Sequence, residues 1–170
     1  MRRRCSGFSL LELVVSILVI AILMAVAYSK LEQMAEGVEQ TSFSGVQDNI
    51  QAQLTLKVAY WYAEQQQVSE ETLRYSNPLD WVQYRPLNYA GELVYTELSD
   101  ADAEHWYFVK DKHWLVYKAK RISHLVNGFE QGDIIPFQVK VRFANAGQAR
   151  GLAVEATLEE LYPFDWQTEE

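Results

Sequence analysis

One apolar run near the N-terminus constrains this chain more than any other feature. From Phe8 to Tyr28 the sequence carries a single charged residue, Glu12. As a helix with a rise of about 1.5 Å per residue, this run would be about 31 Å long, which matches the hydrocarbon thickness of a bilayer. The run therefore predicts a transmembrane helix that carries one carboxylate.

A carboxylate within a membrane helix calls for an explanation. At the centre of a bilayer it costs about 2.5 to 3.5 kcal/mol on insertion scales, and an intramembrane acid therefore indicates a function and a partner. The natural partner is an amine, and cleavage after Gly7 would create one on Phe8, one helical turn from Glu12. The alternative is that Glu12 marks the interface end of the helix, with its side chain reaching the headgroups.

The order of features resembles the signal of type IV pilins and type II secretion pseudopilins: a basic leader, Gly7, Phe8, Ser-Leu-Leu, Glu12 and an apolar run. The resemblance implies that a prepilin peptidase cleaves between Gly7 and Phe8 and methylates the new amino group of Phe8. It also implies that Glu12 acts in assembly, by pairing with the Phe8 amine of a neighbouring subunit. The resemblance covers the N-terminal segment alone.

Two other fates of this segment stay open. Ala25-Val26-Ala27 is an A-x-A pattern behind an apolar stretch, which is typical of a secretory signal peptide cleaved after Ala27. An uncleaved membrane anchor is the third possibility. Glu12 and the Gly7–Phe8 junction favour prepilin-type processing, because ordinary signal cleavage requires neither.

The flanking charges predict the orientation of the segment. Arg2, Arg3 and Arg4 precede the apolar run, so the positive-inside rule places the N-terminus in the cytoplasm. We expect a single-pass protein of the inner membrane of a Gram-negative-type cell, with a periplasmic globular domain that later enters a pilus or pseudopilus.

Charge and composition exclude several functions. Removing three of the 15 basic residues with the leader leaves 12 against 23 acidic ones, a formal charge of −11. An acidic domain without a clustered basic face is a poor partner for nucleic acid. The sequence has no glycine-rich phosphate loop, no G-x-S-x-G elbow and no cysteine after Cys5. We therefore predict neither an enzyme nor a cofactor.

The apolar pattern continues beyond the membrane run at steps of three or four residues. This predicts an amphipathic helix over residues 29–67 with one buried stripe. Gly37 and Gly45 bracket the segment where a bend or local melting would occur. The predicted stripe consists of Leu31, Met34, Ala35, Val38, Ser42, Val46, Ile50, Leu54, Val58 and Trp61.

Residues 68–91 are expected to form a surface loop with a helical turn near Glu70. Residues 92–170 are expected to form an antiparallel sheet and a tail, which Pro163–Trp166 holds in place.

The fold class is α+β: a long N-terminal helix packed on a four- to five-stranded antiparallel sheet, as in pilins. The expected strands are Glu92–Thr96, Trp106–Val109, Trp114–Lys118, Phe137–Phe143 and, after a turn at 145–147, Leu152–Leu158. In the last hairpin we expect Val139, Val141, Leu152, Val154 and Ala156 to face the helix, and Lys140, Arg142 and Glu155 to face solvent.

Two clusters are candidate metal ligands. Asp100, Asp102 and Glu104 alternate in one loop and would suit calcium, which prefers several oxygen ligands, but a solvated acidic turn explains them with fewer assumptions. His105 and His113 flank one predicted hairpin and would approach each other there. Surface histidines are the simpler interpretation.

The domain organisation follows: a cleaved leader at 1–7, a transmembrane and filament-core helix at 8–28, and one globular domain from 29 to 170. We predict a minor pilin or pseudopilin, because the chain lacks the disulfide and the helix-breaking proline, at Ser29 here, of many major pilins. Expected partners are other pilin-like subunits, the prepilin peptidase, an inner-membrane assembly platform and the bilayer. The alternative is a tip or adhesion subunit that binds a surface or secreted protein through Trp81, Trp106 and Trp114.

Overall fold

The computed structural model describes residues 9–144 and 150–167, and the chain forms two compact units. The first unit runs as far as Val38 and the second begins at Glu39. Gly7 and Phe8 lie outside the described residues, as does the predicted turn at 145–147.

Helix α1 spans Leu10–Ala63 and covers most of both predicted helical segments, 8–28 and 29–67. It is helical at every residue between Gly37 and Gly45, so the predicted melting is not observed there. It ends four residues before the predicted boundary at 67, because Gln65 adopts a left-handed φ of 54°. The amide of Gln65 donates to Tyr62 O at 3.1 Å and that of Gln66 to Trp61 O at 2.8 Å, which is the Schellman pattern that ends many helices.

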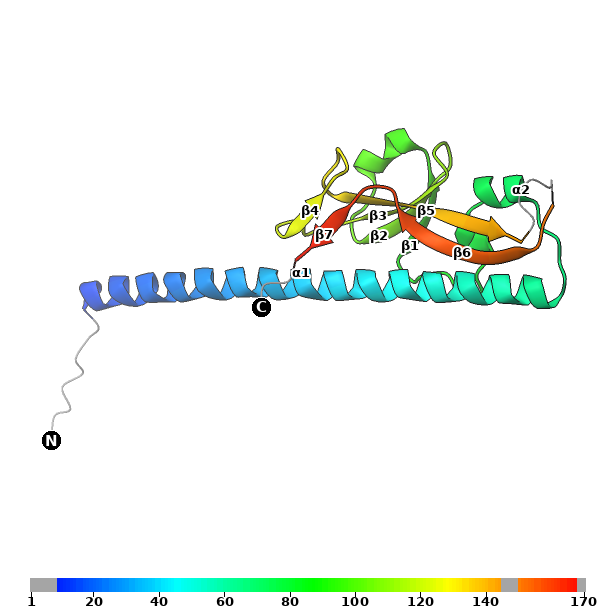
Figure 1. The fold of residues 1–170 in the computed structure, drawn as a ribbon. Coiled ribbons are helices and arrows are strands. Elements are labelled where there is room, and N and C mark those ends of the chain that lie inside the picture. The colour runs from blue at the N-terminus through cyan, green and yellow to red at the C-terminus, as the bar shows by residue number, and fades with distance from the viewer. Residues whose placement is uncertain (1–8, 145–149, 168–170) are drawn as a thin grey trace. The chain divides into compact units, whose positions relative to one another are not determined.

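The second unit holds a five-stranded sheet with the order β1-β2-β3-β5-β6 and a separate two-stranded sheet, β4-β7 (Figure 1). β1 runs parallel to β2, whereas the other pairs are antiparallel. The expected all-antiparallel sheet is therefore wrong at this edge, because the chain crosses back through a 3-10 helix, η2, before β2 begins. The elements are β1 (Tyr89–Leu93), η2 (Tyr95–Asp100), β2 (His105–Val109), β3 (Trp114–Lys118), β4 (Leu125–Asn127), β5 (Ile134–Phe143), β6 (Ala153–Glu160) and β7 (Phe164–Trp166).

The segment predicted as a surface loop is more ordered than expected. It contains α2 (Glu70–Tyr75), which confirms the predicted helical turn, and the 3-10 helix η1 (Pro78–Asp80). Leu73 and Leu79 are buried, and β1 begins at Tyr89 instead of residue 92. The segment therefore contributes to the core as well as to the surface.

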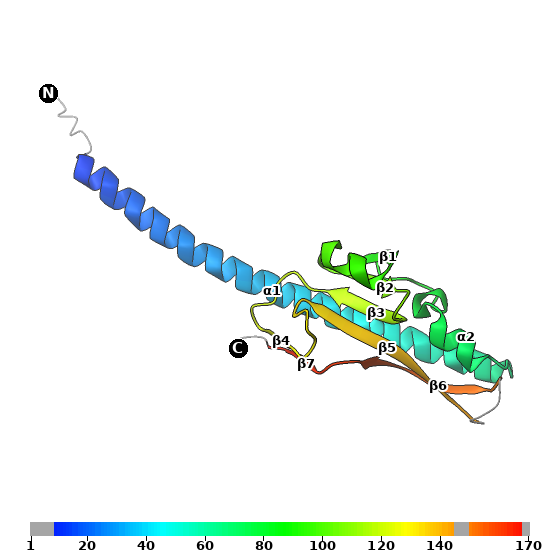
Figure 2. The same cartoon turned by 90° about the horizontal axis from the view of Figure 1, so that it is seen from above.

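In the second unit, the sheet lies against the helical residues that begin at Glu39, so the unit has two layers (Figures 1 and 2). One hydrophobic core lies between these layers and includes Ile50, Leu54 and Phe137. A second, smaller cluster contains Leu98, Tyr107 and Val116, with Leu98 supplied by η2. Side chains that alternate along β2 and β3 supply the two clusters, as expected for a sheet buried on both faces.

The buried stripe of α1 is correct from Val46 onward and wrong before it. Ile50 and Leu54 are fully buried, but Val38 is 69% exposed and Ser42 is exposed. Leu31 and Met34 of the predicted stripe are exposed as well. The buried positions at the start of the second unit are Glu39 and Phe43, each one residue after the predicted Val38 and Ser42. The prediction missed Glu39 because it considered apolar residues and Glu39 is acidic.

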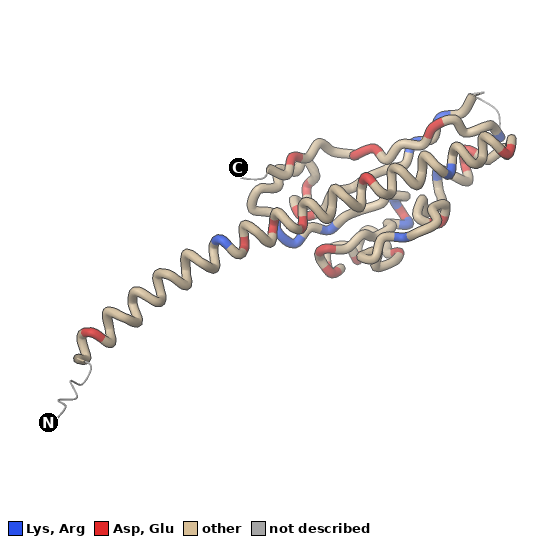
Figure 3. The backbone as a smooth tube through the Cα atoms, turned by 90° about the horizontal axis from the view of Figure 1, so that it is seen from below, with Lys and Arg blue, Asp and Glu red and all other residues tan. Residues whose placement is uncertain are grey.

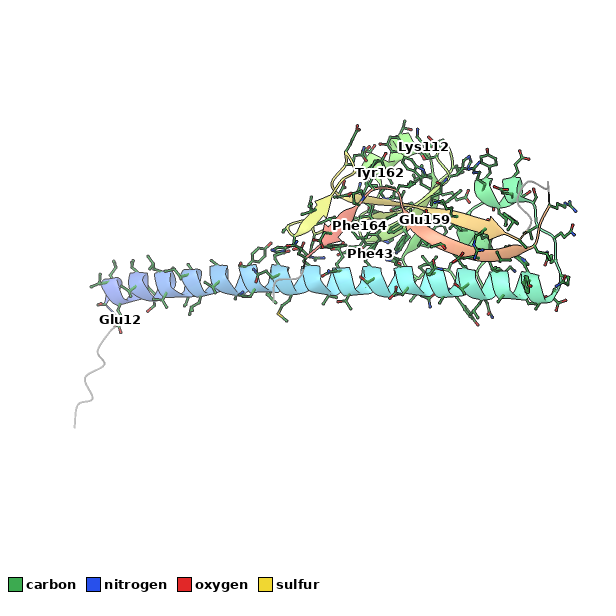
Figure 4. All side chains as sticks on the ribbon, viewed as in Figure 1. Glu12, Phe43, Lys112, Glu159, Tyr162 and Phe164 are labelled. Atoms are coloured by element: carbon green, nitrogen blue, oxygen red, sulfur yellow. The ribbon has the colours of Figure 1, made fainter. Side chains whose placement is uncertain are left out.

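Phe43 is the centre of an aromatic cluster that joins the helix to both sheets. Its ring stacks on Trp106 at a centroid distance of 5.5 Å and meets Phe164 of β7 edge-on at 5.7 Å (Figure 4). The other rings around it are those of Tyr117 at 4.9 Å, Phe137 at 6.1 Å and Trp166 at 5.7 Å. Trp166 is 6% exposed, which confirms that the segment after Pro163 packs the tail against the core.

The β5–β6 hairpin departs from the expected alternation at one residue. Arg142 pairs with Glu155 and Phe143 pairs with Ala153, so Val154 is an extra residue in the ladder. This β-bulge shifts the side-chain alternation. Ala153 joins the core in place of Leu152 and Val154, while Ala156 and Val139 take their expected positions.

Phe43→Ala should destabilise the second unit by about 3–5 kcal/mol, because truncation of a buried aromatic ring leaves a cavity. Denaturant unfolding of the full chain in detergent, followed by tryptophan fluorescence, measures this loss. Leu56→Ala, at a position on the same helix that is 69% exposed, is the control and should change stability by less than about 0.5 kcal/mol. Equal losses in both variants would contradict the role of Phe43.

Candidate functional site

The first unit begins at a capped helix terminus. The Oγ atom of Ser9 accepts a hydrogen bond from the Glu12 amide at 3.1 Å, and Ser9 O accepts one from Leu13 N at 3.1 Å. Ser9 is therefore the N-cap of α1. Ser-x-x-Glu is also the spacing of a capping box, a signal that would have located this terminus from the sequence.

Glu12 lies in the first turn of α1 and is exposed (Figure 4). A negative charge in the first turn is favourable, because the helix dipole gives this end a partial positive charge. Its backbone oxygen accepts a hydrogen bond from Ser16 Oγ at 2.7 Å. The structure thus gives Glu12 a local role at the helix start, and its pairing with an amine of another subunit stays a prediction.

The rest of the first unit presents large apolar side chains at the surface. Leu10 is 81% exposed and Ile22 is 57% exposed. Figure 3 shows α1 without a basic or acidic segment between the acid in its first turn and the basic residue Lys30. Among the described residues, α1 is the one helix long and apolar enough to cross a membrane, judged by length and composition, and none of its apolar window is buried.

In the second unit, the buried carboxylate of Glu39 accepts four hydrogen bonds. Its side chain is 3% exposed. The donors are Tyr117 Oη at 3.2 Å, Lys120 N at 2.8 Å, Arg121 N at 3.2 Å and Arg121 Nη1 at 3.3 Å. Sequence analysis missed this site, because an acid between apolar positions is normally read as a solvent-facing residue.

The same guanidinium links Glu39 to the acidic loop. Arg121 Nη1 lies 2.6 Å from Glu104 Oε1, and this hydrogen bond, with the one to Glu39, raises the pKa of Arg121. Burial raises the pKa of the Tyr117 hydroxyl, and the nearby charge of Glu39 raises it further. The guanidinium of Arg121 therefore lies between two acids and links the helical residue Glu39 to the acidic loop.

The three candidate calcium ligands are not assembled into a metal site. Glu104 pairs with Arg121, and the Asp102 carbonyl accepts from Tyr107 Oη at 2.9 Å. Across residues 9–144 and 150–167, no group of three or more His, Cys, Asp or Glu side chains could hold a metal ion. The Nζ atom of Lys118 binds the loop instead, at 3.0 Å from Leu98 O and 2.7 Å from Ser99 O.

The two candidate histidines have different neighbours. His105 Nδ1 lies 2.7 Å from Ala103 O at the start of β2. The His113 ring lies 4.8 Å from the Tyr75 ring of α2. Each histidine therefore has its own contact, and neither contact involves the other histidine.

Of the three tryptophans proposed to bind a partner, one is buried and two are half-buried. Trp106 is 0% exposed, so it cannot contact another protein, and its inclusion in a binding surface was wrong. Trp81 packs on Trp61 at 6.0 Å. Trp114 meets Tyr95 edge-on at 6.2 Å.

Comparison with known proteins identifies the N-terminal segment. Residues 2–28 match the family model described as the prokaryotic N-terminal methylation motif, and this confirms the resemblance to the type IV pilin and pseudopilin signal. Neither the curated proteins nor the solved structures contain a match to the chain.

The motif and the α+β fold together support a type IV pilin-like or pseudopilin protein. Proteins of this class are structural rather than catalytic. The motif implies processing by a prepilin peptidase and assembly with other pilin subunits, and the apolar helix fits membrane anchoring.

The second unit should lose stability above about pH 10, because the folded state raises the pKa of Tyr117 above the value of about 10 that a tyrosine has when unfolded. Deprotonation then favours the unfolded state. Tyr117→Phe should weaken this dependence by up to about 1.4 kcal/mol per pH unit, measured by denaturant unfolding between pH 8 and 11. Tyr60→Phe, at a position that is 57% exposed, is the matched surface control. An unchanged profile in Tyr117→Phe would contradict the assignment.

Proposed function

We propose that this protein is a minor pilin or pseudopilin, a structural subunit of a type IV pilus or a type II secretion-like filament. The observation that supports this most is the match of residues 2–28 to the methylation motif, in a helix whose apolar side chains are exposed and whose first turn carries one acid. The second unit adds a packed domain in which the structure describes no metal cluster among residues 9–144 and 150–167.

The apolar surface of the first unit can be covered in the membrane and in a filament, so a membrane-anchored subunit can be assembled into a filament. Exposed side chains such as Leu18 and Leu23 must be covered by lipid or by other apolar helices. In the membrane, lipid covers them. In a filament, the same helices of neighbouring subunits take the place of lipid, so the fold of a subunit need not change when it leaves the membrane.

Glu12 sets the position of one subunit's helix along the helix of its neighbour in the filament. Residue 8 becomes the N-terminus after cleavage, and its amine is four residues from Glu12 along the chain. In a medium of low dielectric constant, both charges are costly when alone and attract each other strongly when close. A neighbouring subunit that brings its amine to Glu12 is therefore favoured over one that is shifted along the helix.

The basic leader supports the orientation in this proposal. Arg2, Arg3 and Arg4 hold the N-terminus in the cytoplasm, where the prepilin peptidase cuts between Gly7 and Phe8. The globular domain then lies in the periplasm of a Gram-negative-type cell until an inner-membrane platform moves the subunit into a filament.

The intact mass of the protein purified from membranes should correspond to residues 8–170 plus one methyl group. Mass spectrometry distinguishes this product from the one that begins at Tyr28, which ordinary signal cleavage after Ala27 would give. Gly7→Val should block cleavage, because the bulkier side chain occupies the position before the cut bond, and the full-length mass should then be recovered. A wild-type mass that starts at residue 28 would overturn the proposal.

Glu12→Gln should leave the protein processed and anchored but should reduce its entry into filaments at least about tenfold, because the amide keeps the size of the side chain and removes its charge. Immunoblots of sheared filaments and of membranes measure the two pools. Glu64→Gln removes an exposed acid at the other end of α1 and should have no effect. Normal filament entry by the Glu12 variant would show that the charge has no role in assembly.

A further inference from the structure

The outer edge of β6 has backbone groups that face no neighbouring strand. β6 is the last strand of the five-stranded sheet, and Ala156 and Leu158 on it are 2% and 8% exposed. Backbone groups of alternate residues point to the same side of a strand, so Ala156 and Leu158 direct theirs to one side while Thr157 directs its own to the other. Buried backbone groups at an edge need partners.

One side chain of α1 supplies these partners. Gln51 Nε2 donates to Ala156 O at 3.0 Å, and Gln51 Oε1 accepts from Leu158 N at 2.8 Å. Gln51 Nε2 also donates to Thr55 Oγ1 at 3.2 Å. The side-chain amide therefore uses both N–H groups and its oxygen, and the donor on Leu158 and the acceptor on Ala156 fix its orientation.

This pairing reproduces that of a neighbouring strand. A residue in a parallel strand donates to the carbonyl of one residue and accepts from the amide two residues further along, and the Gln51 amide makes the same two bonds. We infer that the side chain of Gln51 acts as a substitute for a sixth strand and closes the edge of β6 against the backbone of another chain. An exposed strand edge would otherwise be a template for strand addition.

A second glutamine of α1, Gln53, also makes two hydrogen bonds with the backbone through its side-chain amide. Gln53 Nε2 donates to Tyr84 O at 2.9 Å, and Gln53 Oε1 accepts from Tyr84 N at 2.9 Å. Residues 51 and 53 are about 200° apart around the helix, so they leave α1 on opposite flanks of the buried stripe. Gln53 holds a loop that belongs to neither sheet and provides a matched control.

Hydrogen exchange of the full chain in detergent micelles, measured by NMR, tests the inference at one atom. In Gln51→Ala the Leu158 amide loses its acceptor, so its exchange should become at least about tenfold faster relative to that of Thr157. Gln53→Ala should leave the ratio of the Leu158 and Thr157 rates unchanged. An unchanged ratio in Gln51→Ala would overturn the inference, and this readout does not depend on whether the protein forms filaments.

A second variant keeps the test decisive if Gln51→Ala unfolds. In Gln51→Glu, the carboxylate can accept from Leu158 N but has no proton for Ala156 O, whereas the protonated acid can make both bonds. The melting temperature of this variant should fall below that of the wild type at pH 7, and the deficit should narrow as the pH falls to 4. Gln67→Glu, at an exposed position in the segment after α1, should show no such pH dependence. A deficit in Gln51→Glu that is constant with pH, or absent at pH 7, would overturn the inference.

Discussion

The second unit depends on a single buried carboxylate. Glu39 is the first residue of this unit, and its four hydrogen bonds come from Tyr117, Lys120 and Arg121, all at or just after the end of β3. Leaving such a charge without its cation would cost about 3–5 kcal/mol. Hydrophobic contacts along α1 tolerate small rotations of the helix, whereas these directional bonds do not. Glu39 and Phe43 lie four residues apart on one face of α1, so the side of the helix that makes these bonds is also the side that buries Phe43.

The first unit is under the opposite constraint. Its apolar side chains have no partner layer among the described residues of the same unit, so they require a medium or like helices around them. One helix thus serves two environments: apolar and nearly uncharged as far as Tyr28, and striped from Glu39 onward. The change occurs without a break in the hydrogen-bonded backbone, so a single element connects membrane insertion with the folding of the globular domain.

Sequence patterns predicted the main features of this molecule and missed those that depend on contacts between distant residues. The N-terminal motif, the helix and the β2–β3 hairpin follow from local order, spacing and alternation. The burial of Glu39 depends on Arg121, which lies 82 residues away, and no local pattern contains that information. The β-bulge at Val154 and the parallel pairing of β1 are likewise set by the tertiary fold. The clearest local signal that was overlooked is the Ser9-x-x-Glu12 spacing at the start of α1.

Lys118 has a consequence for the loop that it holds. Lys118 is 7% exposed, and its ammonium group binds the carbonyl oxygens of Leu98 and Ser99, near the end of η2 and beside the acidic residues that follow. Because this cation is part of a side chain, it cannot dissociate, be chelated or be exchanged as a bound metal ion can. The backbone at Leu98 and Ser99 is therefore held by a cation that belongs to the chain itself.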